Sequence, residues 1–129
     1  MSMITDMTKK AWLIALIAIA FAAGLRAADP TGRWTATFNT EIGEQQYTYD
    51  FVVKGTTLTG TIKGNLTGES QVTEGKIDGD KITFVESVTF MEMPLRITYA
   101  GVMTSADEIT FTRNVADIAN EELVAKRVK

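Results

Sequence analysis

Cysteine and histidine are both absent from this chain of 129 residues. Without cysteine there are no disulfides, no thiolate nucleophiles and no structural zinc site of the usual kind. Without histidine the Ser-His-Asp and Cys-His catalytic schemes are excluded, together with most transition-metal sites. We therefore predict no metal-ligating residues, and any catalysis by this chain is expected to proceed without histidine or cysteine chemistry.

Clusters of basic residues are missing as well. The chain has 13 basic and 16 acidic residues, and the part after residue 27 has 10 basic and 15 acidic residues, a net charge of −5. An acidic domain without a lysine or arginine cluster binds a phosphate backbone poorly. Nucleic acid is therefore not expected as a partner.

An apolar stretch near the start of the chain has the form of a secretory signal. Lys9 and Lys10 precede residues 11–25, which are apolar throughout, and small residues follow before Pro30. The stretch is shorter than the roughly 20 residues of a membrane-spanning helix, and its order is that of a signal peptide. We expect a signal-peptide helix within residues 1–27, preceded by a few residues that resemble a vector-encoded leader, and a separate domain in residues 28–129.

Cleavage of that signal places the domain in the periplasm or outside the cell, without membrane contact. An uncleaved membrane anchor is the alternative. The oligomeric state is left open by the sequence.

From Thr31 onward, apolar residues recur at every second position, which is the period of a half-buried strand and not of a helix. Glycine and aspartate fall between the alternating runs, where they favour tight turns. The one helix candidate in this part covers residues 115–122. The predicted strands cover residues 34–38, 47–53, 58–62, 72–77, 82–90, 95–103, 109–111 and 123–128.

These short strands predict an all-β fold. Successive antiparallel hairpins of this kind favour a single up-and-down β-barrel of about eight strands, because closure removes the exposed edges that invite aggregation. A two-sheet sandwich is the structural alternative.

The segment at 32–34 resembles the Gly-x-Trp opening of the calycins, the lipocalin-like barrels. The resemblance implies that Trp34 closes one end of a barrel and that a basic side chain from the last strands packs across it, a part that Arg113 or Arg127 fits. Residues 32–127 are also similar to uncharacterised exported bacterial domains that occur alone or appended to secreted sugar-processing hydrolases. That similarity implies an accessory or binding module, and no catalytic residues come with it.

Glu86 is the most informative polar position. It lies two residues after Phe84 and two before Val88, and alternate residues of a strand share a face. Strand geometry therefore points its carboxyl to the apolar face. A buried carboxylate costs several kcal/mol unless it is paired, and Arg113 shares the parity of Phe111. We predict a Glu86–Arg113 pair that serves as a polar anchor, or as an acid of raised pKa, in an apolar cavity. A purely structural ion pair, or a bulge that turns Glu86 outward, is the alternative.

Four aromatic residues with polar atoms are expected to face inward and to contact a ligand: Trp34, Tyr47, Tyr49 and Tyr99. Such side chains suit sugars and amphipathic molecules. Filling of the barrel core is the alternative. Met91 and Met93 have the opposite parity from Phe90, which suggests an exposed pair at a rim.

These features favour an exported binding module for a small amphipathic or sugar-like ligand, which would serve carbohydrate processing as an accessory. One alternative is a small hydrolase of a glycoside, ester or lactone that uses Glu86, assisted by calcium at Asp78 and Asp80. Another is a structural or protein-interaction domain without a cavity. No cofactor other than that calcium ion is expected.

Overall fold

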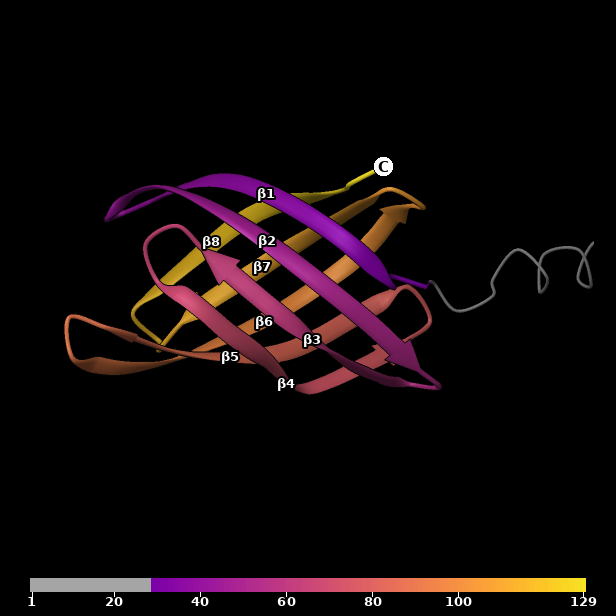
Figure 1. The fold of residues 1–129 in the computed structure, drawn as a ribbon, viewed down its shortest axis with the longest axis horizontal. Helices are drawn as coiled ribbons and strands as arrows, with labels where there is room; N and C mark the ends of the chain where they lie inside the picture. The colour runs from indigo at the N-terminus through magenta and orange to yellow at the C-terminus, as the bar shows by residue number, and fades with distance from the viewer. Residues whose placement is uncertain (1–28) are drawn as a thin grey trace, which may run out of the picture.

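The computed structural model describes residues 29–129, so the predicted signal peptide lies outside the described part of the chain. Residues 29–129 form eight strands and no helix (Figure 1), and none of them belongs to a helix able to cross a membrane. The strands are β1 (Gly32–Thr40), β2 (Gly43–Lys54), β3 (Thr57–Gly64), β4 (Gly68–Asp78), β5 (Lys81–Phe90), β6 (Met93–Ser105), β7 (Glu108–Val115) and β8 (Ala119–Arg127).

The sheet closes on itself as an up-and-down barrel. Each strand pairs antiparallel with the next, and β1 completes the ring by pairing with β8 through Trp34 opposite Arg127. This confirms the predicted barrel of about eight strands and excludes the sandwich. Closure follows from the sequence because every strand has one apolar face, and only a ring buries all eight faces without leaving an edge.

Aromatic side chains fill the middle of the barrel. The rings of Phe84 and Tyr99 stack with centroids 4.2 Å apart, and Tyr49 meets Tyr99 edge to face at 5.9 Å. Gly64 provides the space for the neighbouring ring of Tyr47, because a Cβ atom at this position would lie 2.7 Å from Cε1 of Tyr47. Such aromatic packing leaves little empty space in the middle of the barrel.

One local prediction was wrong. Residues 115–122 form no helix, because β7 ends at Val115, residues 116–118 make a tight turn and β8 begins at Ala119. Pairing of the two strands in this hairpin replaces the weak local helix preference. Strand β4 contains the predicted strand at 72–77 but begins earlier, at Gly68, and it carries a bulge between Thr73 and Lys76, where Glu74 has a φ of 51°.

One end of the barrel, here called the closed end, is covered by Trp34 and Arg127. The guanidinium carbon of Arg127 lies 4.4 Å from the centroid of the Trp34 ring. The indole Nε1 donates a hydrogen bond of 2.8 Å to the carbonyl of Pro30, and Arg127 Nη1 donates to the carbonyl of Thr31. The basic residue expected to cover Trp34 is therefore Arg127, and Arg113 lies elsewhere.

Candidate functional site

A cavity of about 200 Å³ enters the barrel at the other end, which we call the open end. Val88, Leu95 and Ile97 supply apolar wall from β5 and β6. They meet in the barrel because alternate residues of each strand face inward. The polar lining consists of Thr40, Glu41, Gln45, Thr67, Arg113 and Glu121. The open end therefore combines an apolar wall with a small number of polar groups, as ligand sites do.

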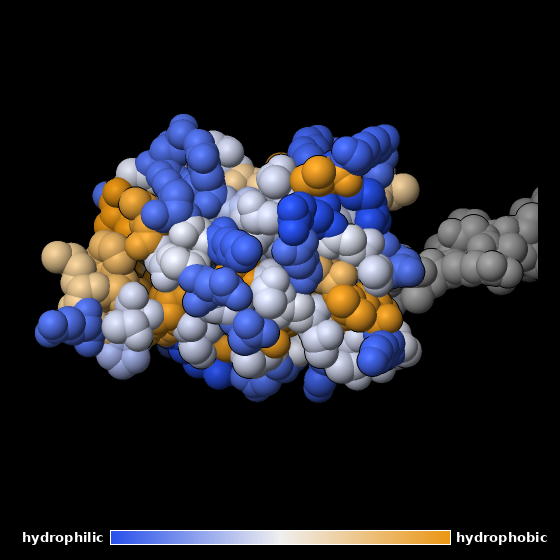
Figure 2. Space-filling model, viewed as in Figure 1, coloured by the Kyte–Doolittle hydropathy of each residue, from blue (hydrophilic) through white to orange (hydrophobic). Residues whose placement is uncertain are grey.

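The rim of the open end is made by four loops, residues 41–42, 65–67, 91–92 and 116–118. Each loop contains an exposed apolar residue or is followed by one: Ile42, Leu66, Met91 with Met93, and Ile118. Met91 and Ile118 are 86% and 72% exposed, and Figure 2 shows hydrophobic side chains gathered at the end where the β5–β6 loop projects. The methionine pair is therefore exposed at the rim, as predicted.

The charge of these loops has one sign. Glu41, Glu92 and Asp117 lie in them, and none of the four contains a lysine or arginine. A molecule that enters the cavity therefore passes an apolar rim with a negative potential.

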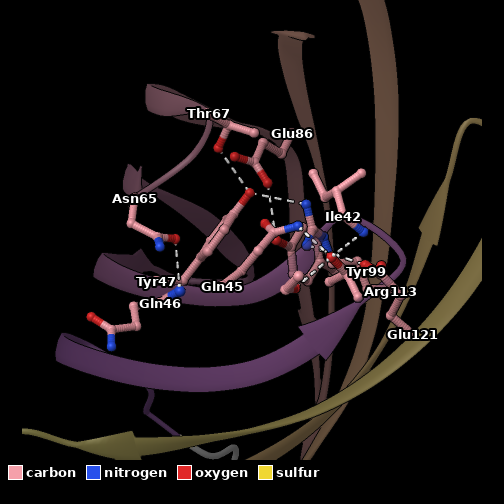
Figure 3. A network of polar contacts seen from close by, with 12 residues as sticks. Ile42, Gln45, Gln46, Tyr47, Asn65, Thr67, Glu86, Tyr99, Arg113 and Glu121 are labelled. Carbon is pink, nitrogen blue, oxygen red and sulfur yellow. Dashed lines mark hydrogen bonds and ion pairs between the residues drawn. The ribbon is translucent and has the colours of Figure 1, made fainter.

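Arg113 is the charged group at the base of the cavity, and only 2% of it is exposed. Its Nη1 lies 3.2 Å from Glu121 Oε1, and its Nη2 donates a hydrogen bond of 3.0 Å to the hydroxyl of Tyr47. Figure 3 shows that hydroxyl between Thr67 and the guanidinium group. The rings of Tyr47 and Phe38 lie 4.8 and 5.3 Å from the guanidinium carbon. Cation–π contact and hydrogen bonding together hold the guanidinium in one orientation.

Glu121 is less deeply buried, since it stands where the cavity opens. Burial raises the pKa of its carboxyl; the charge of Arg113 opposes this shift and that of Glu41 adds to it.

Two buried polar atoms of residues that line the cavity lack a hydrogen-bond partner among the described residues. They are Nε of Arg113 and Oε1 of Gln45, and the side chain of Gln45 is itself almost fully buried. Gln45 Nε2 donates to the hydroxyl of Thr40 at 3.0 Å, and that hydroxyl donates onward to the carbonyl of Gly43. The amide of Gln45 is therefore oriented with its oxygen as the free group.

Glu86 lies on the inner face with no exposed surface. It accepts hydrogen bonds from Ser70 Oγ at 2.7 Å and from the hydroxyl of Tyr99 at 2.9 Å, and the hydroxyls of Tyr99 and Tyr49 are 3.1 Å apart. Burial raises the pKa of the Glu86 carboxyl, against the opposing effects of Ser70, Arg113 and Tyr99. Burial also raises the pKa of Tyr99 well above its usual value, so Tyr99 acts as a hydroxyl donor.

The structure corrects the predicted pairing of Glu86 with Arg113. Both side chains face inward, but within residues 29–129 the ion pair of Arg113 is with Glu121, and the partners of Glu86 are Ser70 and Tyr99. The reason is register: Arg113 stands directly opposite Glu121 on β8, whereas β6 separates it from the strand of Glu86. Side chains directly opposite each other on paired strands are close enough to interact, whereas side chains on strands that are not paired are farther apart.

The predicted aromatic contacts lie at different depths. Tyr47 borders the cavity through its bonds to Thr67 and Arg113. Tyr49 and Tyr99 lie in the middle of the barrel beside Glu86, and Trp34 covers the closed end. Contact of these residues with a ligand stays a prediction.

No family model, curated protein or solved structure matches the chain. The similarity to calycins and to exported accessory domains therefore stays a prediction. Within residues 29–129, no three acidic side chains are grouped so that they could hold a metal ion, and this includes Asp78 and Asp80.

Sequence reasoning missed several residues of the open end. Gln45 continues the inward parity of Tyr47, and Glu121 that of Leu123, so a signal was present for both. Ile118 lies in a turn, where periodicity carries no information. Its position at the mouth follows only from the folded arrangement of the loops.

Proposed function

We propose that this protein binds a small amphipathic molecule in the cavity at the open end of the barrel. The observation that carries the proposal is the cavity of about 200 Å³, with an apolar wall, the buried Arg113 at its base and apolar residues around its mouth. Concave sites with an apolar lining and a few placed polar groups are the usual form of small-molecule sites. Export to the periplasm or beyond, inferred from residues 1–27, is part of this proposal.

The size of the cavity limits the ligand. An engineered apolar cavity of about 150 Å³ holds benzene, and drug-sized ligands occupy roughly 300–1,000 Å³. A cavity of about 200 Å³ therefore suits a molecule of a few carbon atoms, or the polar end of a longer one whose chain emerges over Met93 and Ile118. We favour an amphipathic ligand over a sugar because the wall is formed mainly by aliphatic side chains, and the four predicted aromatic contacts are not in it.

The hydrolase alternative draws no comparable support. Glu86 has no exposed surface and is hydrogen-bonded to Ser70 and Tyr99. A glycosidase needs a second carboxylate, and Glu74 is exposed and lies 3.0 Å from Arg96 in a surface ion pair. A substrate in the open-end cavity would meet neither carboxylate directly.

The test is a binding experiment on the mature domain with benzene and hexan-1-ol as probes, followed by NMR of the methyl groups. We expect saturable shifts at Val88, Leu95 and Ile97. Ala119→Trp should abolish them, since Ala119 lies in the cavity lining and a large ring there blocks the mouth. Glu122→Trp is the matched control, because Glu122 is an exposed residue of the same strand. Absence of shifts with both probes, or shifts confined to the outer surface, would contradict the proposal.

A further inference from the structure

Two residues that line the cavity each carry a buried polar atom without a hydrogen-bond partner, one a donor and the other an acceptor. Arg113 Nε and Gln45 Oε1 have no partners among residues 29–129, although both side chains are at least nine-tenths buried and both line the cavity. Buried polar groups of folded proteins are nearly always hydrogen-bonded. Neither atom has appreciable accessible surface, so the two side chains must shift slightly for a group in the cavity to reach them. Two such exceptions among the residues that line one cavity point to a group that enters it and bonds to both.

The two free atoms need different partners in a ligand. The guanidinium N–H of Arg113 needs an acceptor, whereas the amide oxygen of Gln45 needs a donor, because its amino group is already bonded to Thr40. A hydroxyl or a primary amide provides an acceptor and a donor at once. A carboxylate provides only acceptors and an ammonium only donors, so either ion leaves one of the two buried atoms unpaired.

Charge also disfavours an ionic head group. The positive charge of Arg113 is balanced by Glu121 at 3.2 Å, and the rim contributes Glu41, Glu92 and Asp117. An anion would be repelled by these carboxylates, and a cation at the base would lie beside the guanidinium group.

We propose that the ligand has an uncharged head group that is both donor and acceptor, and that it enters head first. The head accepts from Arg113 Nε and donates to Gln45 Oε1, while a short apolar chain packs on Val88, Leu95 and Ile97. Short-chain alcohols and primary amides are the chemical class. This inference rests on the proposed function, and it adds the head group and the orientation.

The experiment compares dissociation constants for a series of equal chain length at neutral pH. Hexanamide provides donor and acceptor, heptan-2-one an acceptor only, hexanoate a negative charge and hexylammonium a positive charge. We expect hexanamide to bind about tenfold more tightly than each of the other three, the effect of one unpaired buried group. This comparison uses the unmodified protein and so does not depend on the folding of any variant.

Variants then test the assignment of the acceptor. Gln45→Met should reduce the preference for hexanamide over heptan-2-one to nearly one, because the oxygen that receives the amide N–H is gone. Gln45→Glu should shift the preference toward hexylammonium. Gln46→Met is the matched control, since Gln46 is the next residue of β2 and is exposed, and it should leave the preference unchanged.

The outcomes separate the two proposals. If benzene and hexan-1-ol bind in the cavity but the four compounds bind equally well, the cavity is a binding site and the head-group inference is overturned. Tighter binding of hexanoate or hexylammonium overturns it too. If none of these compounds binds, the proposed function itself fails.

Discussion

The hydroxyl of Tyr99 lies 2.9 Å from Oε1 of Glu86 and donates a hydrogen bond to it in the middle of the barrel. The carboxyl receives a second bond from Ser70, and Tyr49 completes the group through its hydroxyl, 3.1 Å from that of Tyr99. This polar group lies below the cavity and is enclosed by aromatic rings. Its first role is therefore structural, and the predictions that concern it are predictions of stability.

Tyr99→Phe should lower the free energy of unfolding by about 1–3 kcal/mol, because it removes one of the two bonds to a buried carboxyl and leaves Tyr49 without a partner. Urea unfolding measures the loss. Tyr49→Phe is the control, since it leaves both bonds to Glu86 in place, and it should cost about 0.5–1.5 kcal/mol. An equal loss of unfolding free energy in the two variants would show that the bond from Tyr99 to Glu86 adds no stability beyond that of the Tyr49–Tyr99 bond.

Glu86 should make the protein less stable as the pH rises. Burial raises its pKa in the folded state above the ordinary value of 4.5, so between the two values the folded protein holds a proton that the unfolded chain has released. Stability from this group is greatest below pH 4.5 and is lost as the pH rises through the folded pKa.

Glu86→Gln removes this titration. We expect the variant to gain stability relative to the unmodified protein as the pH rises above 4.5. Urea unfolding at several pH values provides the difference curve. A flat difference across that range would mean that the carboxyl titrates alike in the folded and unfolded states.

Arg113 should be coupled to Glu121 more strongly than to Glu86. In double-mutant cycles with Arg113→Met, Glu121→Gln and Glu86→Gln, we expect a coupling energy of about 0.5–3 kcal/mol for the pair with Glu121. The value for Arg113 with Glu86 should be smaller, because no direct bond joins these side chains among the described residues. The reverse order would restore the pairing predicted from parity.

Arg127→Met should destabilise the closed end. The arginine covers Trp34 and donates hydrogen bonds to the carbonyls of Thr31 and Ala106. Cation–π contact is worth about 0.5–2 kcal/mol and each hydrogen bond about 1 kcal/mol more, so a cost of about 2 kcal/mol or more in thermal or urea unfolding is expected. Lys126→Met is the control, because that lysine is largely exposed in a surface pair with Glu108, and it should change stability by less than about 0.5 kcal/mol.

The barrel could be predicted from the sequence because its pattern is local. Alternation identifies which residues of a strand face inward, and it placed Glu86 and Arg113 correctly on the inner face. It does not identify the neighbours of an inward residue, since these depend on register and on the tilt of the strands. For this reason the predicted partner of Arg113 was wrong. Glu121 was overlooked, although it lies two residues before Leu123 and therefore on the same face of the strand.

The position and the volume of the cavity could not be predicted. Its volume depends on which inward side chains fill the barrel at each level, and the large rings of Tyr49, Phe84 and Tyr99 are concentrated in the middle. The free atoms of Gln45 and Arg113 are likewise known only after every other partner has been assigned. Both are properties of packing, and no short sequence pattern encodes them.

The hydrogen bonds at the closed end also fix where the two ends of the described chain lie. Arg127 donates a hydrogen bond to the carbonyl of Asp29, and Lys129 forms an ion pair with Asp107 in the loop between β6 and β7. Both ends of the described chain therefore lie at the closed end, away from the mouth. A carrier surface, a tag or a second domain joined at Lys129 is therefore attached at the pole opposite the entrance. The barrel can be immobilised by that end for ligand screening with its mouth facing outward into the medium.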